Sequence, residues 1–244
     1  LRSAWGDPWR FESSREHFFP MQNPAQVRGI FSRIAARYDL ANHLLSGGLD
    51  FLWRARAVRL VAPWQPRTIL DLATGSGDLA LALQKKLPQA RIVGADFCLP
   101  MLQVAARKGL HPLVAADGTR LPFADASFDA VTVAFGLRNM ESWPGALREM
   151  SRVLHPGGHL LLLDFSLPRP PLDKIYRLYL HRILPLIAGL LTNHRAGYEY
   201  LGASIETFPS GQAMLDLLSS QGFSAPQAYA LAAGIVTIYT AQKP

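Results

Sequence analysis

Short apolar runs alternate with amphipathic segments from about residue 67 onward. The runs have the length of buried strands, and the segments between them repeat apolar residues at helical spacing. Strands are expected near residues 67–73, 90–96, 111–117, 127–135 and 158–166, with helices near 78–87, 99–109 and 143–154. This order predicts parallel β–α–β units and therefore an α/β fold with an open, doubly wound sheet.

The pattern changes after Pro168. Residues 172–191 and 210–223 have helical spacing, and residues 225–244 contain two strands joined by a short turn. So short a turn predicts an antiparallel pair. The expected sheet is therefore seven-stranded and mostly parallel, with a terminal antiparallel hairpin and a helical insertion, or lid, over residues 170–205.

The N-terminal part also divides into two. Residues 24–62 have helical spacing, interrupted at Ser46–Gly48, and are interpreted as a helical cap on a cofactor-binding core at residues 67–166. Both belong to a single domain, residues 21–244. Residues 1–20 show no sustained period, and we interpret them as a disordered arm or a non-native extension.

Composition narrows the choice of ligand. The net charge of +7 suits an acidic small molecule, a membrane surface or nucleic acid. Aromatic residues are not interleaved with the basic ones, so nucleic acid is not expected. A single cysteine, Cys98, indicates a reducing cytoplasm, and no zinc-type spacing of cysteine or histidine predicts a metal.

A glycine-rich turn, DLATGSGDLA at residues 71–80, carries the first chemical signal. Gly75 and Gly77 are compatible with a dinucleotide turn, but they are also ordinary residues for a strand-to-helix connection. Asp71 and Asp78 flank the loop, and two carboxylates disfavour a pyrophosphate. They favour a ligand that carries a cation, as S-adenosylmethionine does.

Two further acids follow successive strands. Asp96 ends the second predicted strand, where an acid commonly binds ribose hydroxyls, and Asp117 ends the third, where it could bind the adenine amino group. The alternative is that these acids are solvated strand ends or helix caps. Three acids together with the glycine turn predict an S-adenosylmethionine site.

Two longer stretches, residues 38–53 and 152–166, resemble signatures of the ubiquinone/menaquinone biosynthesis C-methyltransferases. This family consists of class I S-adenosylmethionine-dependent enzymes with a Rossmann-like fold. The matching residues are Tyr38, Asp39, Asn42, Ser46, Gly48 and Trp53, then Arg152, Val153, Pro156, Gly157, Gly158 and Ser166. The resemblance covers about residues 27–241 and includes 121–131 and 135–140.

The chain departs from this family at several positions. Ala41, Asp50 and Phe51 replace its usual Met, His and Arg, and His155 and Asp164 replace its usual Lys and Glu. By position, the resemblance implies cofactor contacts at Ser76, Asp96, Asp117 and Gly118. A serine contact of the family falls on Ala134, so one hydroxyl contact is lost there.

The resemblance implies C-methylation of a reduced polyprenyl quinone, most often demethylmenaquinol, with S-adenosylhomocysteine as the second product. The benzoquinol of the ubiquinone pathway is a further acceptor to consider. Arg138 and Asn139 are our choice for orienting the quinol hydroxyl or a water, with Tyr38, Asp39 and Asn42 as the opposite wall and Asp39 as a candidate base. The alternative is that Arg138 pairs with an acid such as Asp164 and that Asn139 caps a helix.

Two other functions stay open at this point. One is methylation of another phenolic or lipid substrate, and the other is a non-catalytic partner that binds S-adenosylmethionine or quinols. A polyprenyl tail stays in the bilayer, so residues 174–191, with Lys174, Arg177 and His181 beside apolar residues, are either an interfacial helix or a lid, and both can hold. We expect a cytoplasmic protein, peripheral at the inner face of the membrane, and the prediction also allows a homodimer.

Overall fold

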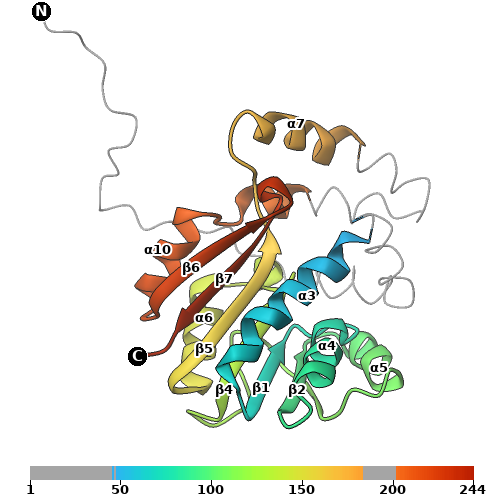
Figure 1. The fold of residues 1–244 in the computed structure, drawn as a ribbon, viewed down its shortest axis with the longest axis vertical. Coiled ribbons are helices and arrows are strands. Elements are labelled where there is room, and N and C mark those ends of the chain that lie inside the picture. Colours follow the sequence, from blue (N-terminus) through green and yellow to red (C-terminus); the bar gives the residue numbers. More distant parts are fainter. Residues whose placement is uncertain (1–45, 47, 184–201) are drawn as a thin grey trace, which may run out of the picture.

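The computed structural model describes residues 46, 48–183 and 202–244, and it confirms the predicted α/β architecture. The described part contains a seven-stranded sheet in the order β3-β2-β1-β4-β5-β7-β6 (Figure 1). The strands are β1 (Thr68–Leu72), β2 (Arg91–Asp96), β3 (Leu113–Ala115), β4 (Phe128–Ala134), β5 (Leu154–Phe165), β6 (Ser224–Leu231) and β7 (Val236–Gln242).

Strand direction follows the prediction and adds one detail. The pairs among β1 to β5 are parallel, whereas β7 is antiparallel to both β5 and β6. The expected terminal hairpin is therefore present, and its second strand inserts between β5 and β6. The carboxyl ends of the five parallel strands consequently share one edge of the sheet, where ligands bind in open α/β folds.

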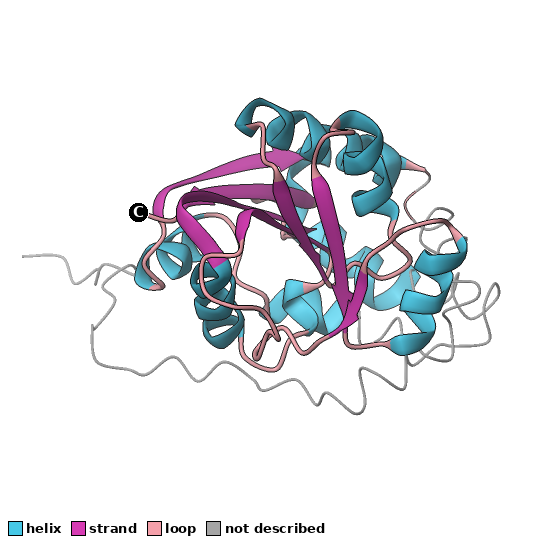
Figure 2. Cartoon of the chain, turned by 90° about the horizontal axis from the view of Figure 1, so that it is seen from below, coloured by secondary structure: helices cyan, strands magenta, loops and turns pink. Residues whose placement is uncertain are grey.

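Helices cover both faces of the sheet (Figure 2). They are α3 (Leu49–Val61), α4 (Asp78–Lys86), α5 (Leu99–Arg107), α6 (Trp143–Val153), α7 (Leu172–Leu178) and α10 (Gln212–Ser220), with short helical turns η1 (Ala62–Trp64), η2 (Leu137–Asn139), η3 (Tyr179–Ile183, a π-helix) and η4 (Ala232–Gly234). Residues of α3, α4 and α5 pack in one apolar core, and residues of α6 and α10 pack in another on the opposite face.

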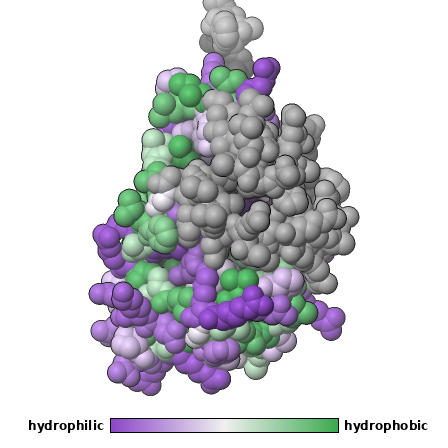
Figure 3. Space-filling model, turned by 90° about the vertical axis from the view of Figure 1, so that its right-hand side faces the viewer, coloured by the Kyte–Doolittle hydropathy of each residue, from purple (hydrophilic) through white to green (hydrophobic). Residues whose placement is uncertain are grey.

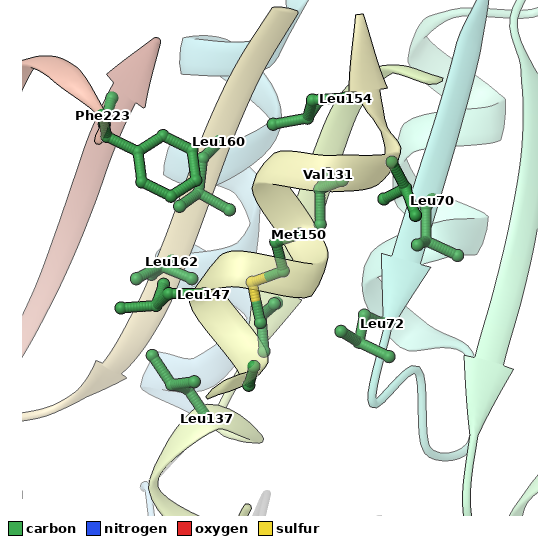
Figure 4. Close-up of a cluster of buried hydrophobic side chains, with 14 of the residues drawn as sticks. Leu70, Leu72, Val131, Leu137, Leu147, Met150, Leu154, Leu160, Leu162 and Phe223 are labelled. Atoms are coloured by element: carbon green, nitrogen blue, oxygen red, sulfur yellow. The ribbon is translucent and has the colours of Figure 1, made fainter. Parts of the chain in front are cut away.

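Strand β5 shows how one strand serves both cores. Leu160 and Leu162 belong to the core under α6, together with Met150 (Figure 4), whereas Leu161 and Leu163 belong to the core under α3. This division follows from the two-residue period of a strand, which sends successive side chains to opposite faces. Each fully buried leucine contributes roughly 1.5–3 kcal/mol to folding.

The beginning of β5 differs from the prediction. The strand starts at Leu154, four residues before the expected 158, and therefore includes residues 154–157, which the prediction left outside it. Pairing with β4 moves from Phe128↔Leu154 to Ala130↔His159, so β5 advances five residues while β4 advances two. Gly157 takes a positive φ of 79° within this bulge, which a glycine tolerates without steric penalty.

Two predicted helical regions are described in part. Of the expected cap at residues 24–62, α3 is described, and residues 24–45 lie outside the described residues. Of the expected insertion at 170–205, α7 and η3 are described, with Tyr176 and Leu180 buried against Ile205. Helix α3 runs opposite to the strands in Figure 1, so its first turns lie at the carboxyl edge of the sheet.

Candidate active site

Two adjoining cavities lie at the carboxyl edge of the described part of the sheet. The first lies beside the glycine turn, and the second, which is the larger of the two, lies beside the ends of β2 and β3. The predicted residues in the first wall are Asp71, Gly75, Ser76 and Ala134, those in the second are Asp117 and Gly118, and Asp96 and Asn139 line both.

Asp71 is the most deeply buried acid of the first cavity, with 1% of its surface exposed. Its two carboxylate oxygens accept hydrogen bonds from the hydroxyls of Thr74, at 2.6 Å, and Thr132, at 2.7 Å. Burial raises its pKa to about 6, although the two hydroxyls and the charge of Arg54 oppose that shift. A nearby positive charge on a ligand would favour the ionised form.

The glycine turn has the backbone that its residues predict. Gly75 and Gly77 have positive φ angles of 56° and 87°. A Cβ on Gly77 would lie 3.0 Å from a methyl of Leu110 and 3.3 Å from the Cβ of Ala105, so this glycine allows α4 and α5 to approach. Gly77 therefore contributes to the packing of the helices next to the turn, and it does not line either cavity.

Asp96 joins the turn to the next loop. Its Oδ2 accepts the N–H of Gly75 at 2.8 Å and its Oδ1 accepts the N–H of Cys98 at 2.8 Å. Burial raises its pKa, and these backbone N–H groups oppose the shift. An ionised carboxylate has about four acceptor positions, so it can hold the loops and still accept ligand hydroxyls.

Asp117 and its neighbour occupy the far wall. Asp117 is exposed and accepts the N–H and the hydroxyl of Thr119, both at 2.8 Å, which fixes the loop after β3. Gly118 is buried, and a Cβ there would lie 2.7 Å from the sulfur of Met140. The absence of a side chain at Gly118 therefore allows Met140 to close this end of the second cavity.

The backbone after β4 carries strain where it meets β1. Phe135 and Ala73 have positive φ angles of 57° and 53°, which are unfavourable for residues with a side chain. A Cβ on Gly136 would lie 2.3 Å from the Cβ of Ala73, so only glycine fits between the two strand ends. Such strain commonly occurs at ligand sites.

Arg138 and Asn139 follow this strained turn in η2. Arg138 is 4% exposed, and its Nη1 donates to Asp164 at 2.6 Å and to the carbonyl of Phe135 at 2.6 Å. The pairing with Asp164 that was considered as an alternative is therefore present. Asn139 donates its side-chain N–H to the carbonyl of Phe135 at 3.2 Å and lines both cavities, whereas Arg138 lines neither.

The cavity also contains a residue that we did not predict. Arg54 of α3 lines the first cavity, pairs with Asp50, and lies 3.6 Å from Asp78. Asp78 is also paired with Lys108 at 2.7 Å, so of the two carboxylates expected to receive a ligand's cation, only Asp71 has no cation paired with it among the described residues.

The remaining predicted residues, Tyr38, Asp39 and Asn42, lie outside the described residues. Trp53 is 7% exposed in the core under α3, as a core aromatic would be. No cluster of three or more His, Cys, Asp or Glu side chains that could hold a metal occurs in the part of the chain that is described. No helix of that part is long and apolar enough to cross a membrane.

The donor set of the two cavities suits S-adenosylmethionine. Asp71 offers a buried negative charge to the ligand's cationic end, and Asp96 stands between the cavities, where ribose hydroxyls can reach it. The wider second cavity, closed by Met140 and Gly118, offers an apolar floor for the adenine ring. A pyrophosphate would place negative charge beside two buried carboxylates, so a dinucleotide does not suit this site.

Solved structures define the class of fold. A SAM-dependent methyltransferase of Thermotoga maritima matches with a TM-score of 0.65 and 18% identity, over 89% of this chain and all of that one. A phosphoethanolamine N-methyltransferase of Haemonchus contortus, solved with S-adenosyl-L-methionine, matches with a TM-score of 0.54 and 14% identity, over 73% and 49% of the two chains. The sheet order and these neighbours define a class I methyltransferase fold.

Sequence comparison then gives the family. A model of the ubiE/COQ5 methyltransferase family matches residues 20–243, and the chain belongs to this family of S-adenosylmethionine-dependent methyltransferases. It is 46% identical to the demethylmenaquinone methyltransferase of Thermus thermophilus over 223 residues, 88% of this chain and 100% of the relative. It is 44% identical to the ubiquinone/menaquinone biosynthesis C-methyltransferase of Syntrophotalea carbinolica, over 88% and 92%.

Proposed function

We propose that the chain transfers a methyl group from S-adenosylmethionine to a ring carbon of a reduced polyprenyl quinone, with demethylmenaquinol as the first acceptor to test. The names of the two relatives support this acceptor. The observation that carries the proposal is the position of Asn139, which lines both cavities beside the buried Arg138. An amide at this junction, with a buried cation in the adjacent residue, suits a hydroxyl-bearing aromatic ring.

The surroundings of Arg138 support an acceptor site on the side of α7. Its guanidinium lies 5.2 Å from the centre of the Phe165 ring, and its charge acts on the hydroxyl of Tyr176, a residue of α7 whose pKa burial raises. Phe165 also packs against Tyr176 and Leu180. Aromatic and apolar side chains thus extend from Arg138 towards α7, and they suit a quinol ring with an apolar tail.

The residues have separable parts in the proposed reaction. When bound, S-adenosylmethionine supplies an electrophilic methyl group. A quinol ring carbon attacks well only when the ring is electron-rich, so the ring hydroxyl must lose its proton early. A cation such as Arg138 favours the ionised hydroxyl, and Asn139 would orient that hydroxyl or a water. A positioned base would accelerate the reaction by roughly 10²–10⁴-fold, and Asp39 stays our candidate for it.

The test is methyl transfer from labelled S-adenosylmethionine to short-chain demethylmenaquinol under reducing conditions. Labelled menaquinol should form, together with S-adenosylhomocysteine, whereas the oxidised quinone should accept no label. A reduced benzoquinol with the same tail tests the ubiquinone-pathway ring. Cofactor binding without transfer to any quinol would reject the acceptor and leave other phenols or lipids to be assayed.

We also propose that α7 contacts a membrane surface, since a polyprenyl tail remains in the bilayer. Leu172, Ile175 and Leu178 are 46%, 66% and 56% exposed, while Lys174 and Arg182 are exposed beside them. Figure 3 shows hydrophobic and hydrophilic residues side by side near the top of the described surface, and Figure 1 places α7 at this end of the molecule. The opposite side of α7 buries Tyr176, so the lid and the interfacial interpretations are compatible.

Vesicles of anionic phospholipid test this contact. Ile175→Glu with Leu178→Glu should abolish co-sedimentation and lower the rate with a long-chain quinol held in the vesicles. The rate with a soluble short-chain quinol should be unchanged, which distinguishes loss of docking from loss of folding. Equal rates of the double variant and the unmodified protein on both quinols would reject the membrane proposal, together with the expected location at the inner face of the membrane. The homodimer that the prediction allows is tested by light scattering.

A further inference from the structure

Arg54 is a cation in the wall of a cavity that is otherwise acidic. It lines the first cavity together with Asp71, Asp96 and Asp78. Its side chain is 12% exposed, and its charge lowers the pKa of Asp71. Taking the charge of an arginine out of water is unfavourable unless carboxylates compensate it, and Arg54 has Asp50 and Asp78 as ion-pair partners.

The packing of α3 fixes where Arg54 points. Trp53, Ala57 and Val61 lie on one side of the helix and are buried in the core shared with α4. Arg54 follows Trp53 by one residue, about 100° around the helix, so its side chain leaves the core at the cavity. Its guanidinium lies 5.9 Å from the centre of the Phe135 ring, at the end of β4.

The contacts of Arg54 leave part of its guanidinium available. Nη1 donates to Asp50, which is itself buried and accepts the hydroxyl of Ser46 at 2.8 Å. Nη2 lies 3.6 Å from a carboxylate oxygen of Asp78, and this distance is longer than a normal hydrogen bond. A guanidinium has five N–H donors in a fork that matches a carboxylate, so the cavity side of Arg54 can accept one.

A second observation points to the same ligand group. Asp78 and Leu79, which begin α4, line this cavity, and no side chain caps the helix at Gly77. Backbone N–H groups at such a helix start favour an anion. The cavity therefore offers a buried acid, Asp71, and a cationic group, Arg54 with the start of α4, to one ligand.

We propose that Arg54 binds the α-carboxylate of S-adenosylmethionine, while Asp71 receives its α-ammonium group, and that Asp50 positions Arg54 for this contact. Asp50 stands where the resemblance described above implies a histidine, and in this structure it pairs with Arg54. The proposal concerns the cofactor, and it does not depend on which acceptor is methylated.

The test compares two ligands that differ only in the carboxylate: S-adenosylmethionine and its decarboxylated form. Calorimetric titration of Arg54→Gln should give a dissociation constant for S-adenosylmethionine raised about tenfold to a hundredfold. The constant for the decarboxylated ligand should change by less than about twofold. The matched control is Arg56→Gln, an exposed arginine of the same helix, which should bind both ligands as the unmodified protein does.

The positioning role of Asp50 is tested in the same way. Asp50→Asn should raise the dissociation constant for S-adenosylmethionine about threefold to tenfold, again without an equal effect on the decarboxylated ligand. Because Asp50 is buried, each variant is first checked by its melting temperature without ligand. A general loss of structure would weaken the binding of both ligands together. The ratio of the two dissociation constants therefore distinguishes a loss of structure from the loss of one contact.

Three outcomes would overturn the proposal. Equal weakening of both ligands by Arg54→Gln would make the arginine structural, and unchanged binding of both would remove it from the cofactor site. An effect on the quinol KM without an effect on cofactor binding would assign it to the acceptor. Failure of quinol methylation alone, with the ligand ratio as expected, would leave this proposal intact and reject only the proposed acceptor.

Discussion

Two buried aspartates at the carboxyl edge of the sheet have different partners. Asp71 and Asp164 are the penultimate residues of β1 and β5, and they are 1% and 2% exposed. Burial raises the pKa of both. Asp164 has an arginine of its own at 2.6 Å, whereas Asp71 is held by two hydroxyls.

This difference separates a structural carboxylate from one that is available to a ligand. A carboxylate with its own guanidinium has little to gain from a second cation. One that is buried with only hydroxyl partners gains most from a cationic ligand, because the unbound protein leaves its charge poorly compensated. The charge of Asp164 is thus compensated by Arg138, whereas Asp71 has only hydroxyl partners.

The largest effect is expected on the free energy of unfolding when the ion pair between Arg138 and Asp164 is broken. Asp164→Asn leaves the Arg138 charge buried without its carboxylate, and unpairing a buried ion pair costs about 3–5 kcal/mol. Denaturant unfolding of the ligand-free protein measures this loss of stability. The double variant Arg138→Met, Asp164→Leu should recover part of the loss, since it removes both charges. Equal stability of Asp164→Asn and the unmodified protein would contradict the comparison.

Asp71→Asn should behave in the opposite way in the same experiment. It removes a buried charge whose pKa is raised to about 6, so the ligand-free protein at pH 7.5 should lose no stability and could gain about 1–2 kcal/mol. Its affinity for S-adenosylmethionine should nevertheless fall by about tenfold or more, because the ligand's cation loses its partner. A stable variant with unchanged affinity would show that Asp71 does not receive the cation.

Asp96 allows a third test, of binding rather than stability. Its carboxylate accepts hydrogen bonds from two backbone N–H groups, and Asp96 lines both cavities. Asp96→Ala should therefore weaken the binding of S-adenosylmethionine by on the order of a hundredfold. S-adenosylhomocysteine contains the same ribose, so its affinity should fall by the same factor in calorimetric titrations. A loss confined to S-adenosylmethionine would assign Asp96 to the sulfonium instead.

The pH dependence of cofactor binding should follow Asp71. Its pKa of about 6 in the ligand-free protein means that it is ionised at pH 7.5 and protonated at pH 5. A cationic ligand prefers the ionised form, so binding releases a proton and weakens as the pH falls through 6, by up to about tenfold per unit. Titrations between pH 5 and 8 measure this, and Asp71→Asn, with Asp96 and Arg54 still present, should flatten the profile.

The sequence predicts one part of this picture well. Each parallel strand is an apolar run, and Asp71, Asp96 and Asp117 lie at or just after the carboxyl ends of three of them, so strand order alone brings these acids to one edge. Arg54, Arg56 and Arg59 are equivalent in the sequence, however, and only the packing of α3 decides which one lines the cavity. Local patterns carry no information of this kind.

Thr132 is the other residue that sequence reasoning could not have assigned. It lies inside the apolar run of β4, where a β-branched residue is expected for its strand propensity. Its hydroxyl binds Asp71 because the register of β1 and β4 places the two residues directly opposite, 61 positions apart in the chain. Register between non-adjacent strands depends on the whole sheet.

Thr132→Val gives the smallest effect and the sharpest test of the open carboxylate. The hydroxyl donates to Asp71 at 2.7 Å and lowers its pKa, so its loss should move the midpoint of the binding profile upward from 6, by up to about one pH unit. At pH 7.5 the affinity should then change by less than about threefold. Thr132→Ser keeps the hydroxyl and is the matched control, with an unshifted midpoint. If the Val and Ser variants gave the same midpoint, the ionisation of Asp71 would not govern cofactor binding. The different partners of Asp71 and Asp164 would then have no consequence for the ligand.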